Sequence, residues 1–287
     1  MSDVELFGTS ITEIVKNRIS VRTYLEQPLT TDLKEKLRGF LSISKGPFGG
    51  NIRFRLIESD IARKGTNAKL GTYGVIRGAS SYVVAAIEKA ERDLEDFGYS
   101  LEKVILYATS LGLGTCWLGG TFKKSEFGKA IEQKDYEILP CISPIGYPSG
   151  RKSLIDSAMR FTAGSKNRKE WAELFFSSDL GHHLSKSEAG KYEIPLEMLR
   201  LAPSASNKQP WRIVKETNKC HFFLQHTKGY AKFMAYDLQR VDMGIAMCHF
   251  ELTAKELGIA GKWQISDIGS ISTPPDTEYV VSWVEGI

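Results

Sequence analysis

The 287-residue sequence lacks the features that mark several large classes of protein. It has no run of about 18 apolar residues, so we expect no segment that spans a membrane. Its beginning, MSDVELFGTSITEIV, has no charged stretch followed by an apolar core, so we expect no signal peptide and a cytoplasmic protein. The formal net charge is only +4, and the basic residues are spread among acidic ones, which disfavours nucleic acid as a partner.

Cysteine is also scarce, and no metal site is expected. The two adjacent histidines, His182 and His183, adjoin a Ser/Gly-rich connector without a Cys or carboxylate at ligand spacing, so we expect them to be solvated loop residues. The sequence shows no Ser/His/Asp set, paired carboxylates or Walker-type loop, and we therefore assign no catalytic side chain. The four cysteines are far apart, form no C-x-x-C pair and are expected to be reduced and mostly in the core: Cys116, Cys141, Cys220 and Cys248.

What the sequence does contain is a pattern that occurs twice. Its 42% apolar and 25% charged residues are typical of a globular protein, and its length allows a core to form without disulfides. In the first half, residues 32–41 have the apolar spacing of a helix, the polar stretch SISKGPFGGN follows, and RFRLIE is typical of a strand. In the second half PLEMLRL, APSASNKQP and WRIVKE follow in the same order.

The repetition continues further along each half. Residues 98–118 and 244–264 align glycine on glycine, and both predict a buried helix that ends at a glycine C-cap. The aligned positions are Ala108 with Ala254, Leu111-Gly112 with Leu257-Gly258, and Trp117 with Trp263. Each half then closes on a strand, within 136–148 and 278–286. This long period suits a duplicated domain: an N-terminal repeat at 1–176, a polar linker at 177–195 and a C-terminal repeat at 196–287.

Two basic motifs occur only in the first half. In RISVRTY, an extended segment would place Arg18, Ser20 and Arg22 on one face, where two guanidiniums beside a hydroxyl suit a phosphate. The alternative is an amphipathic edge strand with solvated arginines. Lys166 and Arg168 in SKNRK, also two residues apart, could face the same ligand or form a solvated basic run.

Two further motifs are rich in polar or small residues. In APSASNKQPW, side chains and backbone amides could contact a flat heterocycle and its polyol chain, or could simply bond the backbone at a helix end. The stretch GLGTCWLGG places Trp117 where a dinucleotide-binding motif needs its third glycine, which argues against that motif. Its Gly119-Gly120 pair would let a backbone amide approach a ligand closely.

Together these segments resemble the nitroreductase-like flavoproteins. RISVRTY is similar to their R-x-S-x-R opening, PSASNKQPW to their P-S-x-x-N-x-Q-P-W segment, and LGLGTCWLGG to the turn beside their flavin ring. IGYP with KNRKEWAELF is similar to their closing strand and basic tail. The resemblance covers almost the whole chain and implies an α+β, three-layer nitroreductase-like fold, with two pseudo-symmetric repeats that mimic the family's homodimer.

The resemblance also implies an FMN site with one set of residues from each half. Arg18, Ser20 and Arg22 would hold phosphate and ribityl oxygens, with Lys166 and Arg168 completing the phosphate site. Gly119, or Gly120, would offer an N–H to flavin N5. A second set of residues would come from the other half of the chain, supported by Gln209. That set would line the flavin ring and ribityl chain from the other half: Pro203, Ser204, Ala205, Ser206 and Asn207.

The function implied by the resemblance is that of an FMN-dependent oxidoreductase. It would take a hydride from NADH or NADPH and reduce a small-molecule acceptor, such as a nitroaromatic or a quinone, by a ping-pong cycle. The alternatives are a flavin-binding sensor or carrier without turnover, and specialised flavin chemistry on the same fold. Because the two halves keep different parts of the site, we expect one FMN per chain and a monomer.

Overall fold

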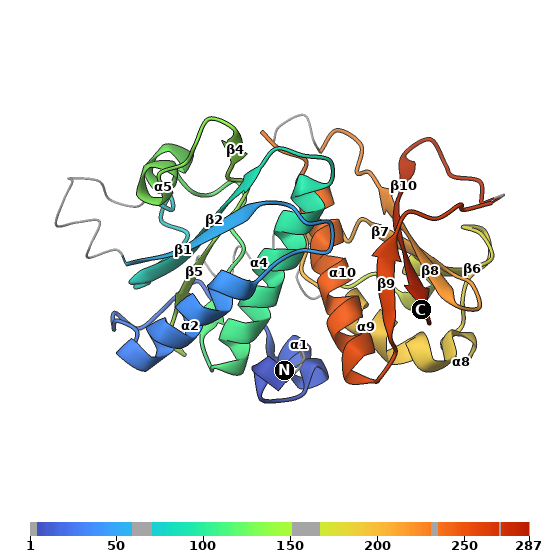
Figure 1. Cartoon of the computed structure of the whole chain (residues 1–287), viewed down its shortest axis with the longest axis horizontal. Coiled ribbons are helices and arrows are strands. Elements are labelled where there is room, and N and C mark those ends of the chain that lie inside the picture. The colour runs from blue at the N-terminus through green and yellow to red at the C-terminus, as the bar shows by residue number, and fades with distance from the viewer. Residues whose placement is uncertain (1–4, 59–70, 151–166, 231–234, 270, 287) are drawn as a thin grey trace. The chain divides into compact units, whose positions relative to one another are not determined.

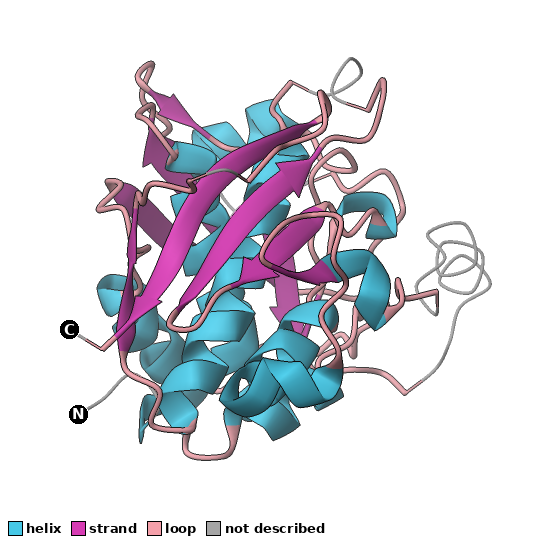
Figure 2. Ribbon diagram, turned by 90° about the vertical axis from the view of Figure 1, so that its right-hand side faces the viewer, coloured by secondary structure: helices cyan, strands magenta, loops and turns pink. Residues whose placement is uncertain are grey.

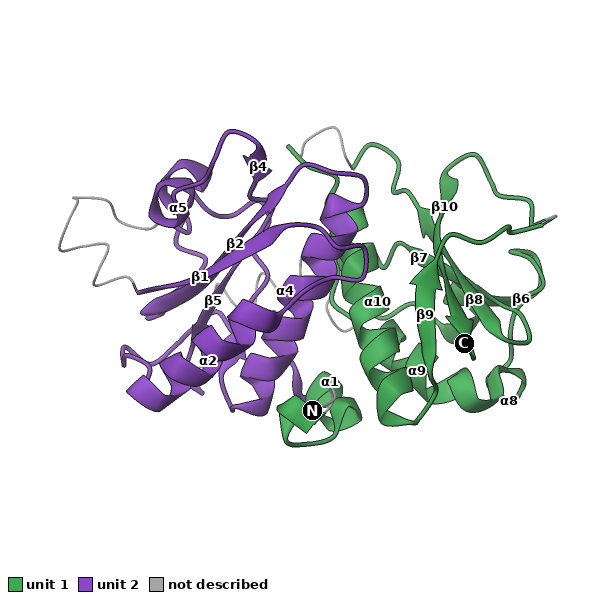
Figure 3. Cartoon of the chain, in the orientation of Figure 1, with its two compact units in different colours: residues 1–16, 165–287 green, residues 17–164 purple. Residues whose placement is uncertain are grey.

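The computed structural model describes residues 5–58, 71–150, 167–230, 235–269 and 271–286. These residues form two compact units, shown in different colours in Figure 3. Unit 1 comprises residues 1–16 and 165–287, and unit 2 comprises residues 17–164. Both units combine helices with a mainly antiparallel sheet, which gives the chain an α+β fold.

Unit 2 is built on an antiparallel sheet with the strand order β1-β2-β5-β3. The short strand β4 pairs with the C-terminal end of β2. Helices α2 and α4 pack beside this sheet and contact each other (Figure 1). The elements in chain order are α2 (Thr31–Ile43), β1 (Ile52–Glu58), β2 (Ser81–Glu88), α4 (Asp93–Ser110), β3 (Gly114–Thr115), α5 (Lys124–Ile131), β4 (Glu137–Ile138) and β5 (Ile142–Gly146).

Unit 1 is built on a sheet with the strand order β6-β7-β8-β10-β9, whose strands are seen in Figure 2. Only the edge strand β6 pairs in parallel, with β7, and the other neighbours are antiparallel. Its elements are η1 (Glu5–Phe7), α1 (Ile11–Asn17), α7 (Trp171–Leu174), β6 (Phe175–Ser177), α8 (Lys186–Ala189), η2 (Gly190–Tyr192), α9 (Glu193–Arg200), η3 (Ala205–Asn207), β7 (Trp211–Lys215), β8 (Lys219–Gln225), α10 (Leu238–Glu256), β9 (Gly261–Gln264) and β10 (Thr277–Glu285).

The two units repeat the same order of elements. Helix α2 corresponds to α9, and β1, β2, α4, β3 and β5 correspond to β7, β8, α10, β9 and β10. The corresponding strands also occupy corresponding places in the two sheets, since β1-β2-β5-β3 matches β7-β8-β10-β9. The predicted sequence of helix, polar turn, strand, long helix and closing strand is therefore present in both units, as a duplicated domain requires.

The helices form where the sequence predicts them. Residues Leu37, Phe40 and Leu41 form the buried stripe of α2, and the Thr30 hydroxyl accepts a hydrogen bond from the Leu33 N–H at its start. Helices α4 and α10 are buried on more than one face. Both are followed by a glycine in the left-handed conformation, Gly112 with φ +75° and Gly258 with φ +73°, so the predicted glycine C-caps are confirmed.

The boundaries between the units differ from the residues expected as repeats and linker. The N-terminal helix α1 belongs to the same unit as the C-terminal strands. Its first N–H groups explain why: the Glu256 carboxylate at the end of α10 accepts from the Ile11 N–H at 2.5 Å and the Thr12 N–H at 3.2 Å. The expected linker, 177–195, contains α8 and η2 and leads directly into α9.

Two composition-based expectations can be compared with the structure. All four cysteines are buried free thiols, as predicted. Among the described helices, none is both long and apolar enough to cross a bilayer.

Candidate functional site

The RISVRTY segment runs in extended conformation along the end of strand β3 in unit 2. Ser20 forms a parallel bridge with Thr115, and the Val21 N–H donates to the Thr115 carbonyl at 2.8 Å. Val21 is 8% exposed, whereas Ile19 is 55% exposed. The predicted extended backbone is confirmed, and it spaces Arg18, Ser20 and Arg22 two residues apart as expected.

Arg18 lies beside a buried acid that the sequence analysis did not identify. Its side chain is 8% exposed, and its Nε lies 3.9 Å from Oε1 of Glu102, which is fully buried on α4. The other carboxylate oxygen of Glu102 accepts a 2.6 Å hydrogen bond from the indole N–H of Trp117. Arg18 Nε itself has no hydrogen-bond acceptor among the described residues. The arginine is thus a buried cation with a nearby counter-charge and unused donor capacity.

The Gly119-Gly120 pair lies two residues after Trp117, the residue that binds Glu102. The preceding residue, Leu118, is fixed by two 3.0 Å backbone hydrogen bonds with Ile142. Gly119 is half-buried and Gly120 is exposed. The structure therefore anchors the start of this turn and leaves its second glycine accessible.

In unit 1, the APSASNKQPW segment forms a turn with an unusual backbone. Ser206, Asn207 and Gln209 have φ values of +50°, +53° and +49°, in the left-handed region that residues with a side chain rarely adopt. Each such residue costs on the order of 1–3 kcal/mol, and this kind of strain tends to concentrate at functional sites. Three of them within four positions require strong support from their surroundings.

That support comes largely from the polar side chains of the turn itself. Ser204 Oγ accepts from the Gln209 N–H at 2.9 Å. The amide of Gln209, a residue only 1% exposed, accepts from the Lys169 N–H at 2.9 Å and donates to the Asn207 carbonyl at 3.1 Å. Asn207 Nδ2 donates to the Asn167 carbonyl at 2.9 Å. The hydrogen-bonding groups noticed in the sequence therefore hold an otherwise unfavourable backbone.

Arg168 contacts the same turn. Its guanidinium donates to the carbonyls of Ala202 at 2.6 Å and Leu201 at 2.9 Å, and to Asn207 Oδ1 at 3.3 Å. Arg168 thus binds carbonyls at the end of α9, where a cation also opposes the negative end of the helix dipole. This local role was not expected from the sequence. Lys166, its predicted companion, lies outside the described residues.

Replacing Asn207 with leucine should lower the melting temperature because both amide hydrogen bonds are lost from a strained turn. Two lost hydrogen bonds of about 1 kcal/mol each correspond to a decrease of roughly 4–8 °C for a domain of this size. Asn207→Asp is the matched control, since its carboxylate can still accept from Arg168, and should cost less. Thermal unfolding followed by circular dichroism measures both, and equal stability of Asn207→Leu and the unmodified protein would contradict this role.

A buried acid supports the turn from the adjacent helix. Asp242 on α10 is 2% exposed, and its Oδ1 accepts from the Ala205 N–H at 2.9 Å. Burial raises the pKa of this carboxyl well above its usual value. The sequence analysis missed Asp242, although it stands two residues before Gly244, where the aligned segment began.

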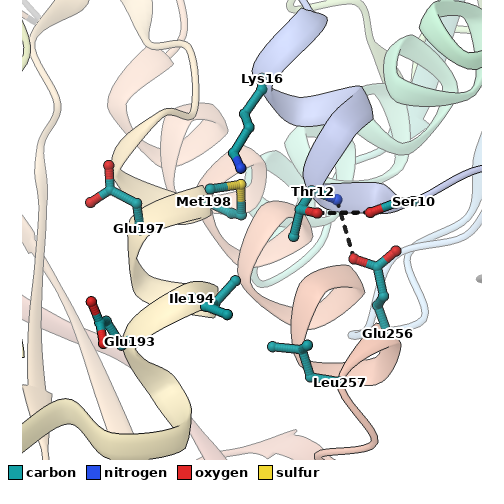
Figure 4. Close-up of a pocket in the computed structure, with 9 residues that line it drawn as sticks. All are labelled: Ser10, Thr12, Lys16, Glu193, Ile194, Glu197, Met198, Glu256 and Leu257. Carbon is teal, nitrogen blue, oxygen red and sulfur yellow. Dashed lines mark hydrogen bonds between the residues drawn. The ribbon is translucent and has the colours of Figure 1, made fainter.

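Unit 1 also contains a pocket of about 450 Å³ (Figure 4). Figure 4 shows Glu256 bonded to the backbone at the start of α1, opposite Ile194 and Met198 of α9. None of the residues assigned to the flavin site lines it. The lining residues are Ser10, Thr12, Lys16, Glu193, Ile194, Glu197, Met198, Glu256 and Leu257.

The structure therefore brings the predicted residues together in two sets. Within unit 2, Arg18, Ser20 and Arg22 share one segment that runs beside the strand leading to Gly119 and Gly120. Within unit 1, Arg168 and Gln209 bind the turn formed by the remaining residues, Pro203, Ser204, Ala205, Ser206 and Asn207. In the described part of the chain, no group of His, Cys, Asp and Glu side chains is arranged to hold a metal ion.

Comparisons with known proteins agree with this architecture. A family model described as "Putative TM nitroreductase" matches residues 10–254. A Thermotoga maritima structure described as a "putative nitroreductase" is 21% identical, with a TM-score of 0.62 over 96% of this chain and 94% of that chain, which shows a shared fold. No curated protein matches the sequence.

Two of the other similar structures are described as nitroreductases that depend on or bind FMN. An "FMN-dependent Nitroreductase" from Clostridium difficile is 19% identical, with a TM-score of 0.40 over 49% of this chain and 88% of that chain. A "Nitroreductase with bound FMN" from Desulfitobacterium hafniense is 18% identical, with a TM-score of 0.39 over 50% of this chain and 92% of that chain.

Proposed function

We propose that this protein is an FMN-dependent oxidoreductase. The chain belongs to the nitroreductase family described as "Putative TM nitroreductase". Its electron donor would be NADH or NADPH, and its acceptor a nitroaromatic, a quinone or a similar small molecule. The observation that carries the proposal is that the family model extends over residues 10–254 and includes both polar motifs. We propose that RISVRTY and APSASNKQPW each contribute residues that contact FMN.

The arginine segment of unit 2 fits the phosphate of FMN. A buried arginine needs anionic or acceptor groups around it, and Arg18 Nε has no hydrogen-bond acceptor among the described residues. A phosphate oxygen would supply one, in addition to the Glu102 carboxylate. Ser20 and Arg22 would contribute from the same extended segment. Arg168 and Lys166 remain candidates for the phosphate, although the local contacts of Arg168 make it foremost a support of the turn.

The strained turn of unit 1 fits the remainder of the cofactor. A turn fixed by Ser204, Gln209 and Arg168 presents its outer atoms without further ordering, which lowers the entropic cost of binding. The residues proposed to line the flavin ring and ribityl chain are Pro203, Ser204, Ala205, Ser206 and Asn207. A backbone N–H of Gly119, or of Gly120, would be directed to flavin N5.

The division of labour follows from these residues. Bound FMN would supply hydride acceptance and electron transfer to the second substrate. The chain would bind the phosphate, fix the orientation of the ring and polarise it through backbone N–H groups. No side chain needs to act as an acid or base in this scheme, and we assign none.

An anaerobic mixture of the FMN-loaded protein with NADH or NADPH tests the proposal. Loss of the flavin absorbance within the time of an enzyme turnover is the expected result, and reoxidation by a quinone or nitroaromatic should restore it. FMN that stays bound and oxidised in the presence of both nucleotides would instead identify a flavin-binding carrier or sensor. A protein that binds no FMN would contradict both functions.

A further inference from the structure

Asp242 occupies a position that the predicted FMN contacts do not explain. It lies near the start of α10, four residues after Leu238, is 2% exposed and uses Oδ1 to accept the Ala205 N–H at 2.9 Å. Its Oδ2 is buried and has no hydrogen-bond partner among the described residues. A buried carboxyl that makes a single hydrogen bond lowers the stability of the folded protein, so its presence at this position calls for a specific role.

Unit 2 has the same arrangement at the equivalent place. Asp96 stands two residues before Gly98, as Asp242 stands two residues before Gly244, and it is 1% exposed in the first turn of α4. Its Oδ1 accepts from the Phe48 N–H at 2.8 Å, and its Oδ2 from the Gly50 N–H at 2.5 Å. Both donors lie in the polar turn between α2 and β1. In each unit, therefore, an aspartate of the long helix binds the turn that precedes the first strand of the repeat.

The two turns nevertheless differ in how they are fixed. Both oxygens of Asp96 are used, and the backbone passes so close that a Cβ at Gly46 would lie 2.2 Å from Asp96 Oδ1. Asp242 binds only Ala205, the first residue of η3, and left-handed residues follow immediately at Ser206 and Asn207. In unit 1, the carboxyl thus fixes the point at which the strained backbone begins.

We propose that Asp242 is a positioning residue for the FMN site, which holds Ala205 so that the following residues keep the left-handed conformation that presents them to the cofactor. This inference rests on the proposed FMN-dependent function. The other supports act on either side of Ala205: Ser204 Oγ binds the Gln209 N–H, and Arg168 binds the Asn207 side chain and two carbonyls at the end of α9. Among the described residues, only Asp242 accepts from the backbone N–H of Ala205, and burial of the carboxyl keeps water from competing for this bond.

The role of Asp242 depends on an acceptor at Oδ1, which makes the choice of substitutions informative. Asp242→Leu has the same branched side-chain skeleton and no acceptor, so the Ala205 N–H loses its partner and the turn can relax. We expect its FMN dissociation constant to rise by about ten- to a hundredfold, with an altered visible spectrum of the flavin bound at saturation. Asp242→Asn keeps the acceptor, and no described donor faces Oδ2, so binding within about threefold of the unmodified protein is expected.

The equivalent change in unit 2 is the matched control. In Asp96→Asn, an amide NH₂ replaces one of two oxygens that both accept from the backbone, so a donor would face a donor. We expect this variant to lower the melting temperature while the FMN dissociation constant of the folded protein stays unchanged. The same Asp→Asn substitution should therefore be tolerated at 242 and destabilising at 96.

The measurements are FMN titration by fluorescence quenching, the bound-flavin spectrum and thermal unfolding of each variant. If Asp242→Leu does not fold, Asp242→Ser, whose hydroxyl is too short to reach Ala205, should show the same loss of affinity. An unmodified protein that binds FMN together with an Asp242→Leu or Asp242→Ser variant of equal affinity would overturn the positioning role. So would an Asp242→Asn variant as weak as Asp242→Leu. Failure of the unmodified protein to bind FMN would instead contradict the proposed function.

Discussion

Replacement of Arg18 with alanine is expected to weaken FMN binding by ten- to a hundredfold and to destabilise the folded chain. A hydrogen bond between a guanidinium and a phosphate contributes about 1.5–3 kcal/mol, and each 1.4 kcal/mol changes a dissociation constant tenfold. The destabilisation has a separate cause, since the same substitution removes the counter-charge of Glu102, which is fully buried 3.9 Å away. Removing one member of a buried ion pair typically costs about 3–5 kcal/mol.

Two further variants separate these effects. Arg18→Ala combined with Glu102→Gln removes both charges and keeps an acceptor for the Trp117 indole, so stability should largely return while FMN binding stays weak. Arg38→Ala removes a half-exposed positive charge elsewhere in unit 2, beside Glu58, and should change neither property by much. Calorimetric titration and thermal unfolding give both quantities. Unchanged FMN affinity in Arg18→Ala would remove this residue from the phosphate site.

Much of the fold was predictable because its elements are set by local patterns. The apolar spacing of Leu37, Phe40 and Leu41 defines one face of α2, and Gly112 and Gly258 end the long helices in the conformation that glycine favours. The matched pairs Ala108 with Ala254 and Trp117 with Trp263 placed the same elements in both halves. These signals lie within a few residues of the structure they determine.

The division into units was not predictable in this way. It depends on where the first 16 residues pack, and the contact that fixes them joins the Ile11 N–H to Glu256, 245 residues further along the chain. Helical periodicity in α1 identifies a helix and its apolar face, but it does not identify the unit that receives that face. A strand such as β6, which extends the second sheet in parallel, is similarly defined by its long-range partner.

For the candidate site, the sequence singled out two motifs but not the contacts that their side chains make. Of the two roles considered for the polar groups of APSASNKQPW, the structure shows the local one: Ser204 and Gln209 bond the backbone of the turn, and Arg168 binds carbonyls at the end of α9. Contact with a flavin stays a prediction. The supporting acids Glu102 and Asp242 were missed because a carboxylate inside an apolar helical stripe carries no local sign of its partner. The repeated Asp-x-Gly, at Asp96 and Asp242, was the available signal.

The final prediction is that each chain binds one FMN, because each part of the site occurs once. The sequence contains a single R-x-S-x-R, in unit 2, and a single P-S-x-x-N-x-Q-P-W, in unit 1. At the equivalent place in unit 2, the N–H groups of Phe48 and Gly50 are already bound to Asp96 and are not available to a second flavin. A second FMN would also lack the two arginines that offset the cost of ordering its phosphate.

Calorimetric titration should therefore give a stoichiometry near one FMN per chain, and Asn207→Leu should weaken that single site without revealing another. We further expect a monomer by light scattering, since one chain contains both sets of residues. Two equivalent FMN sites per chain would show that unit 2 can replace the missing motif and would refute the single-site prediction. A stable dimer with one FMN per chain would contradict only the expected assembly, because the count of cofactor motifs would still hold.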